Sequence, residues 1–354
     1  MDNAFYIADA ISLLKTMISI PSISKEEEQV ADLIQRTMES YGLTTYRLGN
    51  NLWTISTDFD ENKPTVLLNS HMDTVKPVSG WNKQPYTAHL QDGRIYGLGS
   101  NDAGASLVSL LATFLHLTRK QQTYNLIFLA SCEEEISGHN GIEAVLPKLP
   151  ALTFALVGEP TQMHPAIAEK GLMVVDAEAT GISGHAAREE GINAIYNAIR
   201  DITWIQNHTL NKQSDLIGPV RMSVTQIEAG SQHNVIPDTC KYVIDVRSNE
   251  FYSNQEIFNI LEENLQSKLQ ARSFRLNSSK MSPTHPFVQK CLAIGRKPFG
   301  SPTLSDQALI QCPSLKMGPG DSARSHTADE YICIQEIEEA IPMYCELLDG
   351  LEIE

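Results

Sequence analysis

The sequence lacks long hydrophobic runs, clusters of basic residues and internal repeats. No apolar stretch approaches the roughly 20 residues that span a bilayer, and the first residues include acids where a signal peptide would have Lys or Arg. The 27 Lys and Arg residues are outnumbered by 43 Asp and Glu residues, so the clustered positive charge that phosphate binding needs is missing. We therefore expect neither a membrane nor a nucleic-acid partner.

Closely spaced cysteines are also missing. The six cysteines are scattered over 354 residues, and none forms a Cys-x-x-Cys pair. In a chain of this size they indicate reduced thiols rather than a disulfide framework, which favours a cytoplasmic protein. The hydrophobic content of 42% is typical of a globular enzyme, and the length is sufficient for two domains.

In the first part of the chain, helical patterns alternate with short apolar runs. Two amphipathic helices open the chain, and the second is expected to begin at a capping box formed by Ser24 and Glu27. The apolar runs lie at 65–70, 125–131 and 154–158, and further helical patterns cover about 105–119 and 335–348. Continuous apolar runs between helices indicate buried, largely parallel strands that are covered on both faces. The expected fold class is α/β with a mostly parallel sheet.

A different pattern fills residues 172–282. The predicted elements are a strand at 172–180, a helix at 191–208, strands at 220–228 and 239–247, a helix at 253–270 and a short last strand. This βαββαβ order is that of a ferredoxin-like module. Because the module lacks the carboxylate clusters of the rest of the chain, we expect an inserted α+β domain, a lid or dimerisation domain. It would interrupt a catalytic domain formed by 1–171 and 283–354.

Three adjacent carboxylates, Glu133, Glu134 and Glu135, follow the apolar run 125–131. Adjacent like charges repel one another unless a cation compensates them. Other imidazole and carboxylate groups follow predicted strands or lie in loops, namely His71, Asp102, Glu159 and His326. Such groups, brought together at the carboxyl ends of parallel strands, are what a hydrolytic divalent-metal site needs. The sequence therefore predicts a metallohydrolase.

Individually, these residues also allow simpler interpretations. Asp102 opens a helix and is typical of an N-cap, and His326 alone is typical of a surface loop. Asp73 lies two residues after His71, so both side chains point the same way in an extended segment. Asp73 can then accept a hydrogen bond from one ring nitrogen and orient the other toward a metal, unless the two form only a polar pair at a strand end.

Eight segments, in order along nearly the whole chain, resemble the M20 family of metallopeptidases and deacylases. They are 71–75, 97–104, 133–141, 158–161, 181–185, 234–238, 245–247 and 318–326. The resemblance implies a metal-dependent amide hydrolase with two zinc ions, for which cobalt can substitute. It also implies a cis peptide bond between Asp102 and Ala103.

The resemblance further assigns the metal ligands and the catalytic groups. One ion would be bound by His71 and Glu159, the other by Glu135 and His326, with Asp102 as the bridge. Glu134 would be the general base and Asp73 the partner of His71. This register depends on Gly138, because a slip by one residue would make Glu133 the base and Glu134 a ligand.

The inserted module also matches family residues that contact the substrate. Arg247 would bind a carboxylate, for which its planar guanidinium is suited, and His185 would help to hold the carbonyl oxygen. Asn234 would lie beside the substrate. In dimeric members the histidine reaches the partner's active site, so we expect a homodimer.

The segments 158–161 and 318–326 look most like those of acyl-ornithine and acyl-citrulline deacylases of arginine synthesis. The expected function is removal of a short acyl group from the α-nitrogen of an N-acyl amino acid. The alternatives are a di- or tripeptidase of the same family and a succinyl-diaminopimelate-type desuccinylase. From another class, the alternative is a binding module that has lost its metal centre.

Overall fold

The computed structural model describes residues 3–188 and 190–353, which form two compact units. The first unit comprises Met1–Ile167, Met281–Phe299 and Ser305–Glu354, and the second comprises Ala168–Lys280 and Gly300–Leu304. The sequence placed the boundaries after residues 171 and 282, and it did not predict that Gly300–Leu304 would join the second unit.

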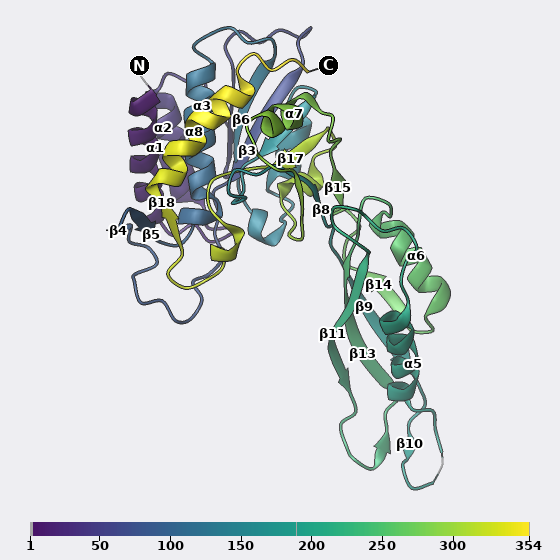
Figure 1. The fold of residues 1–354 in the computed structure, drawn as a ribbon. Coiled ribbons are helices and arrows are strands. Elements are labelled where there is room, and N and C mark those ends of the chain that lie inside the picture. Colours follow the sequence, from purple (N-terminus) through teal and green to yellow (C-terminus); the bar gives the residue numbers. More distant parts are fainter. Residues whose placement is uncertain (1–2, 189, 354) are drawn as a thin grey trace. The chain divides into compact units, whose positions relative to one another are not determined.

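The first unit is built on a mixed sheet with a parallel centre (Figure 1). Strand β3 (Thr65–His71) lies between β6 (Asn125–Ser131) and β7 (Phe154–Val157) and is parallel to both. Strand β17 (Ser314–Lys316) continues the parallel order beside β7. The carboxyl ends of these four strands therefore lie at the same edge of the sheet. The other strands of the sheet are β1 (Tyr46–Leu48), β2 (Asn51–Ile55), β8 (Ala166–Glu169), β15 (Ser279–Lys280) and β16 (Phe299–Ser301).

Both faces of this central sheet are covered. Helix α3 (Ala105–Leu117) packs on β3 and β6, and helices α1 (Asn3–Ile18) and α8 (Ile334–Leu348) pack against α3. On the other face, side chains of the central strands form an apolar cluster with the short helix α4 (Ile142–Val145). Every residue of β3 and β6 is buried, which explains why the sequence shows continuous apolar runs there. The remaining helices of this unit are α2 (Glu28–Ser40), which contacts β2, and α7 (Pro286–Ala293), which contacts α8.

Helix α2 begins without the predicted capping box, so that prediction is wrong. The Ser24 hydroxyl donates instead to Asp73 Oδ2 at 2.7 Å. Residue Glu27 is itself the N-cap, and its buried carboxylate accepts hydrogen bonds from the backbone amides of Lys25 (2.7 Å) and Glu133 (3.2 Å). The two side chains that the local pattern assigned to the cap, Ser24 and Glu27, therefore form hydrogen bonds with other groups instead.

A small three-stranded sheet joins two distant parts of the first unit. It consists of β4 (His89–Gln91), β5 (Arg94–Tyr96) and β18 (Tyr331–Cys333), with β5 in the middle. The pairing of β18 with β5 brings Glu330 beside the loop that follows β5, where its carbonyl oxygen accepts a hydrogen bond from Gly97 N at 3.0 Å.

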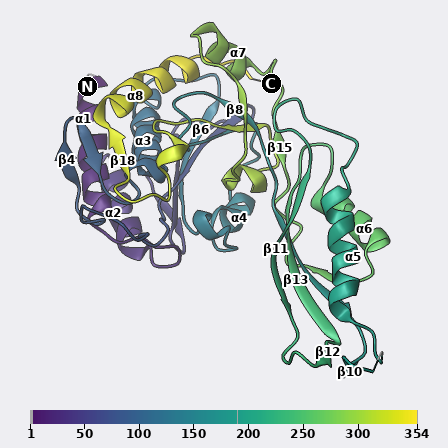
Figure 2. The same ribbon diagram turned by 60° about the horizontal axis from the view of Figure 1, so that its bottom comes forward.

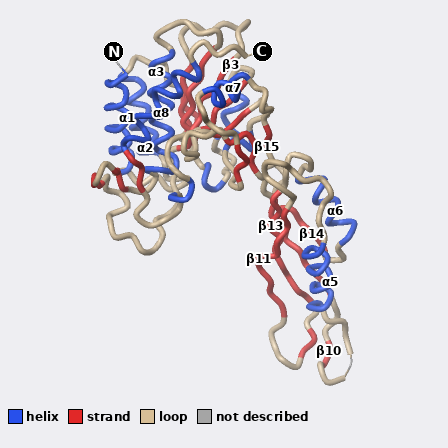
Figure 3. The backbone as a smooth tube through the Cα atoms, in the orientation of Figure 1, coloured by secondary structure: helices blue, strands red, loops and turns tan. Residues whose placement is uncertain are grey.

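The second unit has the βαββαβ order (Figures 2 and 3). In chain order its elements are β9 (Met173–Thr180), α5 (Ala194–Asn207), β11 (Arg221–Ala229), β13 (Thr239–Arg247), α6 (Asn254–Asn264) and β14 (Lys268–Ala271). The strands form an antiparallel sheet in the order β11-β13-β9-β14, and both helices pack on one face of it. Helix α6 has the predicted capping box of Ser253 and Glu256 but ends at Asn264, not at residue 270, because the chain turns into β14.

Candidate metal centre

The predicted ligands follow the carboxyl ends of three adjacent parallel strands in the first unit. Strand β3 ends at His71, β6 is followed by Glu134 and Glu135, and β7 is followed by Glu159. Because these ends share one edge of the sheet, side chains separated by up to 88 positions in sequence come together. The two remaining predicted ligands come from loops: Asp102 lies in the turn before α3, and His326 lies in a loop before β18.

His71 lies at the centre of this cluster. Its Nε2 atom is 3.3 Å from Asp102 Oδ1, 3.8 Å from Glu159 Oε1 and 3.9 Å from Glu134 Oε2. The side chains of these four residues are between 1% and 13% exposed. Three carboxylates therefore converge on one imidazole nitrogen at a site with little access to water.

The second histidine lies on the other side of Asp102. His326 Nε2 is 2.9 Å from Glu135 Oε2 and 3.7 Å from Asp102 Oδ2, whereas Asp102 Oδ1 faces His71. The two carboxylate oxygens of Asp102 therefore face two different histidines. The peptide bond from Asp102 to Ala103 is cis, as predicted.

Asp73 supports this arrangement from behind. The Nδ1 atom of His71 is 2.9 Å from the backbone carbonyl oxygen of Asp73 and 3.5 Å from its carboxylate oxygen Oδ1. An Nδ1–H that donates to this carbonyl leaves the lone pair of the neutral ring on Nε2, facing the cluster. The carboxylate of Asp73 also accepts the backbone N–H groups of Glu134 and Glu135, each at 3.1 Å. It thus anchors the turn that carries both glutamates.

The glutamate register agrees with the position of Gly138. Glu133 adopts a left-handed conformation with φ 55°, and its buried carboxylate accepts a hydrogen bond from Asn140 Nδ2 at 3.1 Å. A Cβ atom at position 138 would collide with that carboxylate. Gly138 therefore leaves room for Glu133 beside the turn, and the two following glutamates are the ones that reach the cluster.

Negative charge is crowded at this site. Burial, reinforced by Asp102, raises the pKa of Glu159 to about 8. Burial also raises the pKa of Glu134 well above its ordinary value. Burial by itself lowers the pKa of His71. The carboxylates around the ring, led by Glu134, outweigh this effect and raise the His71 pKa well above its usual range. The hydrogen bond to Glu135 raises the pKa of His326 to about 9. Each shift shows that the cluster favours positive charge.

The donor set fits a divalent metal ion. Two groups offer ligand atoms that all lie within 4.8 Å of one another: His71 with Glu134 and Glu159, and His71 with Asp102 and Glu135. Imidazole nitrogen and carboxylate oxygen are the ligands of hydrolytic zinc sites. The first group includes Glu134, to which the sequence assigned a proton-transfer role. Residue His326 belongs to neither group but contacts both Glu135 and Asp102.

Sequence reasoning missed three residues that support the cluster. Ser24 bonds Asp73, as described above, and Glu330 bonds the Asp102 loop. Asp306 is buried close enough to Glu134 to act on it electrostatically, and its Oδ2 accepts hydrogen bonds from Ser131 Oγ (2.6 Å) and Asn69 Nδ2 (2.9 Å). Ser24 was taken for a helix cap, and the two acids carry no local pattern because their partners are distant in sequence.

The three predicted substrate contacts belong to the second unit, which separates them. His185 lies in β10 (Gly184–His185), which pairs with β12 (Val235–Ile236), and the Asn234 carbonyl oxygen accepts Ala186 N at 3.0 Å. Both residues therefore lie beyond the Thr239 end of β13, whereas Arg247 closes the other end. The strand between them is about 26 Å long at ~3.3 Å per residue. The Arg247 guanidinium donates two hydrogen bonds to Asp245, of 2.9 and 3.2 Å.

The profile of peptidase family M20/M25/M40 matches residues 67–350, which is most of the chain. The chain belongs to this family. The M20 profile spans most of the first unit and the whole of Ala168–Lys280, and it includes all six clustered side chains. Membership identifies a metal-dependent peptidase or deacylase.

Relatives of this M20 protein carry different activity names. The chain is 26% identical to the acetylornithine deacetylase of Proteus mirabilis, covering 96% of both proteins. It is also 26% identical to the succinyl-diaminopimelate desuccinylase of a Caulobacter species, covering 96% of this chain and 95% of the relative. Its fold is similar to the crystal structure of Bacillus subtilis YXEP, a dinuclear metal-binding M20 peptidase, with a TM-score of 0.76, 16% identity and 98% coverage of each chain.

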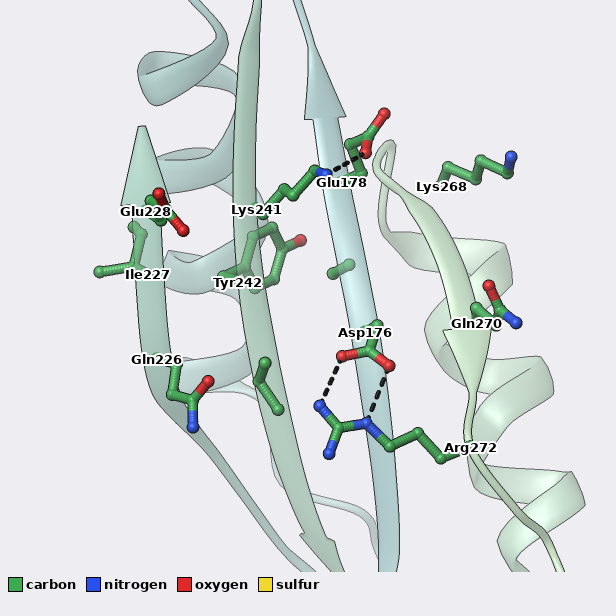
Figure 4. A pocket seen from close by; sticks show the side chains of 12 residues that line it. Asp176, Glu178, Gln226, Ile227, Glu228, Lys241, Tyr242, Lys268, Gln270 and Arg272 are labelled. Atoms are coloured by element: carbon green, nitrogen blue, oxygen red, sulfur yellow. Dashed lines mark hydrogen bonds and ion pairs between the residues drawn. The ribbon is translucent and has the colours of Figure 1, made fainter. Parts of the chain in front are cut away.

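A separate cavity of this M20 protein is lined by residues of the second unit and does not contain the cluster. It has a volume of about 770 Å³ and lies on the open face of the second unit's sheet (Figure 4). Its charged side chains are largely paired with one another: Arg272 donates to Asp176 at 2.9 and 2.8 Å, and Lys241 lies 3.7 Å from Glu178. Because these charges compensate each other, the face is typical of a solvated sheet surface. The described helices include none that is long and apolar enough to cross a bilayer.

Proposed function

We propose that this M20 protein is a metal-dependent amidohydrolase that removes a short acyl group from the α-nitrogen of an N-acyl amino acid. The observation that carries the proposal is the convergence of two histidines and four carboxylates at one edge of the parallel sheet. The preferred substrates are N-acetylornithine and N-acylcitrulline, for which the segments 158–161 and 318–326 and the acetylornithine deacetylase relative are the support. The desuccinylase relative makes an N-succinyl substrate the first alternative.

Two zinc ions are proposed as the cofactor, with cobalt as a substitute. His71 and Glu159 would hold one ion, Glu135 and His326 the other, and Asp102 both. Divalent ions at such a site polarise the scissile carbonyl and activate water for attack. The dinuclear site of the similar peptidase YXEP supports the number of ions.

The proton transfers are assigned to Glu134. Its carboxylate would accept a proton from the attacking water and return it to the amine nitrogen as the amide bond breaks. In the metal-free protein, burial raises the pKa of Glu134 well above its ordinary value. Asp73 would keep both the Glu134 backbone and the His71 ring in place.

The residues of the second unit support a homodimer. Arg247 would bind the substrate carboxylate, His185 would help to hold the acyl carbonyl oxygen, and Asn234 would lie beside the substrate. A small N-acyl amino acid is much shorter than the roughly 26 Å between the two ends of β13. We therefore propose that His185 and Asn234 of each chain act on the substrate of the partner subunit, and that the second unit is both lid and dimerisation domain. A cytoplasmic location is proposed from the scattered cysteines alone.

A hydrolysis screen tests the proposal directly. Purified protein would be loaded with zinc or cobalt and offered N-acetylornithine, N-acetylcitrulline, N-succinyl-diaminopimelate and a series of di- and tripeptides. Fastest release of amine from an N-acyl amino acid is the expected result. Preference for the peptides would support the runner-up, a peptidase like YXEP. Protein that retains no divalent ion after loading would indicate a binding module without a metal centre.

A further inference from the structure

Glu330 is a buried carboxylate that binds the loop carrying Asp102. The residue is 2% exposed. Its Oε1 atom accepts hydrogen bonds from the backbone N–H groups of Asn101 at 2.8 Å and Asp102 at 3.0 Å, and Oε2 accepts that of Gly99 at 3.1 Å. The Glu330 carbonyl oxygen accepts a fourth bond from Gly97 N. One residue therefore satisfies four backbone donors between positions 97 and 102.

These hydrogen bonds would be costly to lose. Gly99 and Asn101 are buried, and a buried amide without an acceptor costs about 1–3 kcal/mol. The loop would therefore have to move if the carboxylate were removed, because its amides would seek other acceptors.

The same chain segment positions both sides of the metal centre. His326 precedes Glu330 by four residues, and the segment continues into β18, which is held by β5. Asp102 faces His326 through Oδ2 at 3.7 Å and His71 through Oδ1 at 3.3 Å. A movement of the loop would change both of these separations.

We propose that Glu330 is a positioning residue for the metal centre, because it holds the loop that places Asp102 between the two histidines. The inference deepens the proposed function and rests on its metal centre. Groups that orient a metal ligand in this way typically change metal affinity about 10–100-fold when they are replaced. Glu330 is not itself a ligand, since its oxygens are directed to backbone amides.

Asp329 is a matched control in the same segment. Its carboxylate accepts hydrogen bonds from the backbone amides of Asn82 (3.0 Å) and Lys83 (2.9 Å) and from Asn82 Nδ2 (2.7 Å). Like Glu330, it binds two or more backbone amides of a distant loop. The 82–83 loop, however, carries none of the candidate ligands, so loss of these bonds should affect stability without affecting the metal centre.

The experiment compares Glu330→Gln with Asp329→Asn in the full-length protein. Zinc affinity would be measured by competition with a chromophoric chelator, and the ligand field by the absorption spectrum of the cobalt-loaded protein. Hydrogen exchange of the segment 97–104 would report whether the loop is released. We expect Glu330→Gln to weaken zinc binding about 10–100-fold, to change the cobalt spectrum and to speed exchange in this segment, whereas Asp329→Asn changes none of the three.

The outcomes separate this inference from the proposed function. If Glu330→Gln binds zinc like Asp329→Asn, with an unchanged cobalt spectrum, Glu330 is only structural and the inference is overturned. If Glu330→Gln does not fold, Glu330→Asp keeps the charge but shortens the reach, and wild-type zinc affinity in that variant overturns the inference equally. Weakened zinc binding together with a wild-type protein that cleaves no acyl substrate would support Glu330 and reject the proposed activity.

Discussion

Replacing Glu134 by Gln should remove turnover while leaving metal binding largely intact. The substitution preserves the size of the side chain, and the backbone bond from residue 134 to Asp73 Oδ1 at 3.1 Å does not depend on the side chain. The amide cannot accept a proton from water at neutral pH, so only the proton transfer is removed. The cluster keeps its other five side chains, namely His71, Asp102, Glu135, Glu159 and His326.

The expected loss follows from the role of a general base. Such a group contributes about 10²–10⁴-fold to rate, which corresponds to about 3–5.5 kcal/mol of activation free energy. The metal-free protein should not lose stability, because burial already raises the pKa of Glu134 and makes its charged form unfavourable. The effect should therefore appear in kcat, with little change in melting temperature.

The assay combines amine release from N-acetylornithine with the zinc content of the same samples. Glu133→Gln is the control, since it makes the same chemical change one residue earlier. Residue 133 bonds Asn140 rather than the cluster, so we expect near wild-type kcat and a stability loss of about 1 kcal/mol.

Two results would refute this reasoning. If Glu134→Gln loses zinc in proportion to its activity, then Glu134 is a ligand, as its place in the group with His71 and Glu159 permits. If Glu133→Gln is inactive but keeps its zinc while Glu134→Gln loses zinc, the glutamate register is shifted by one residue.

Three further predictions concern the supports of the site, its metal and the second unit. Asp73→Asn should lower zinc affinity about 10–100-fold, because Asp73 anchors His71 and the glutamate turn; competition with a chelator measures this. Removal of metal should lower the melting temperature, since bound ions offset the crowded carboxylates and add about 2.7 kcal/mol per site at 100 times the Kd; calorimetry with and without chelator measures this. Mixing inactive His185→Ala with inactive Glu134→Ala should restore activity, because one of the two sites in a mixed dimer would then be intact.

Each of these predictions has a contrary outcome. Wild-type zinc affinity in Asp73→Asn would mean that the His71 ring is oriented by the backbone carbonyl alone. A melting temperature that chelator leaves unchanged would argue against metal in the buried cluster. If subunit exchange is verified and the mixture stays inactive, His185 acts within its own chain or has no catalytic role.

The central strands and the ligand residues could be predicted from the sequence because their signals are local. Strand β6 has the predicted bounds, and β3 and β7 lie within one residue of theirs, since burial on both faces demands continuous apolar runs. His71 and Glu159 were found because each is a polar residue directly after such a run, and Glu135 because it ends a block of three adjacent carboxylates. The capping box of α6, which a four-residue pattern predicted, is likewise confirmed.

Other features depended on contacts that no local pattern records. Ser24 matched a helix cap yet bonds Asp73, which lies 49 residues away. Glu330 is 229 residues from Asn101, and its partners are backbone amides, which are the same for nearly every residue type. The separation of His185 and Arg247, which lie beyond opposite ends of β13, likewise follows from the strand pairing of the second unit. Local sequence patterns predict which side chains can bind metal or cap a helix. The distance between two groups that are far apart in sequence, however, is decided by how the strands pair.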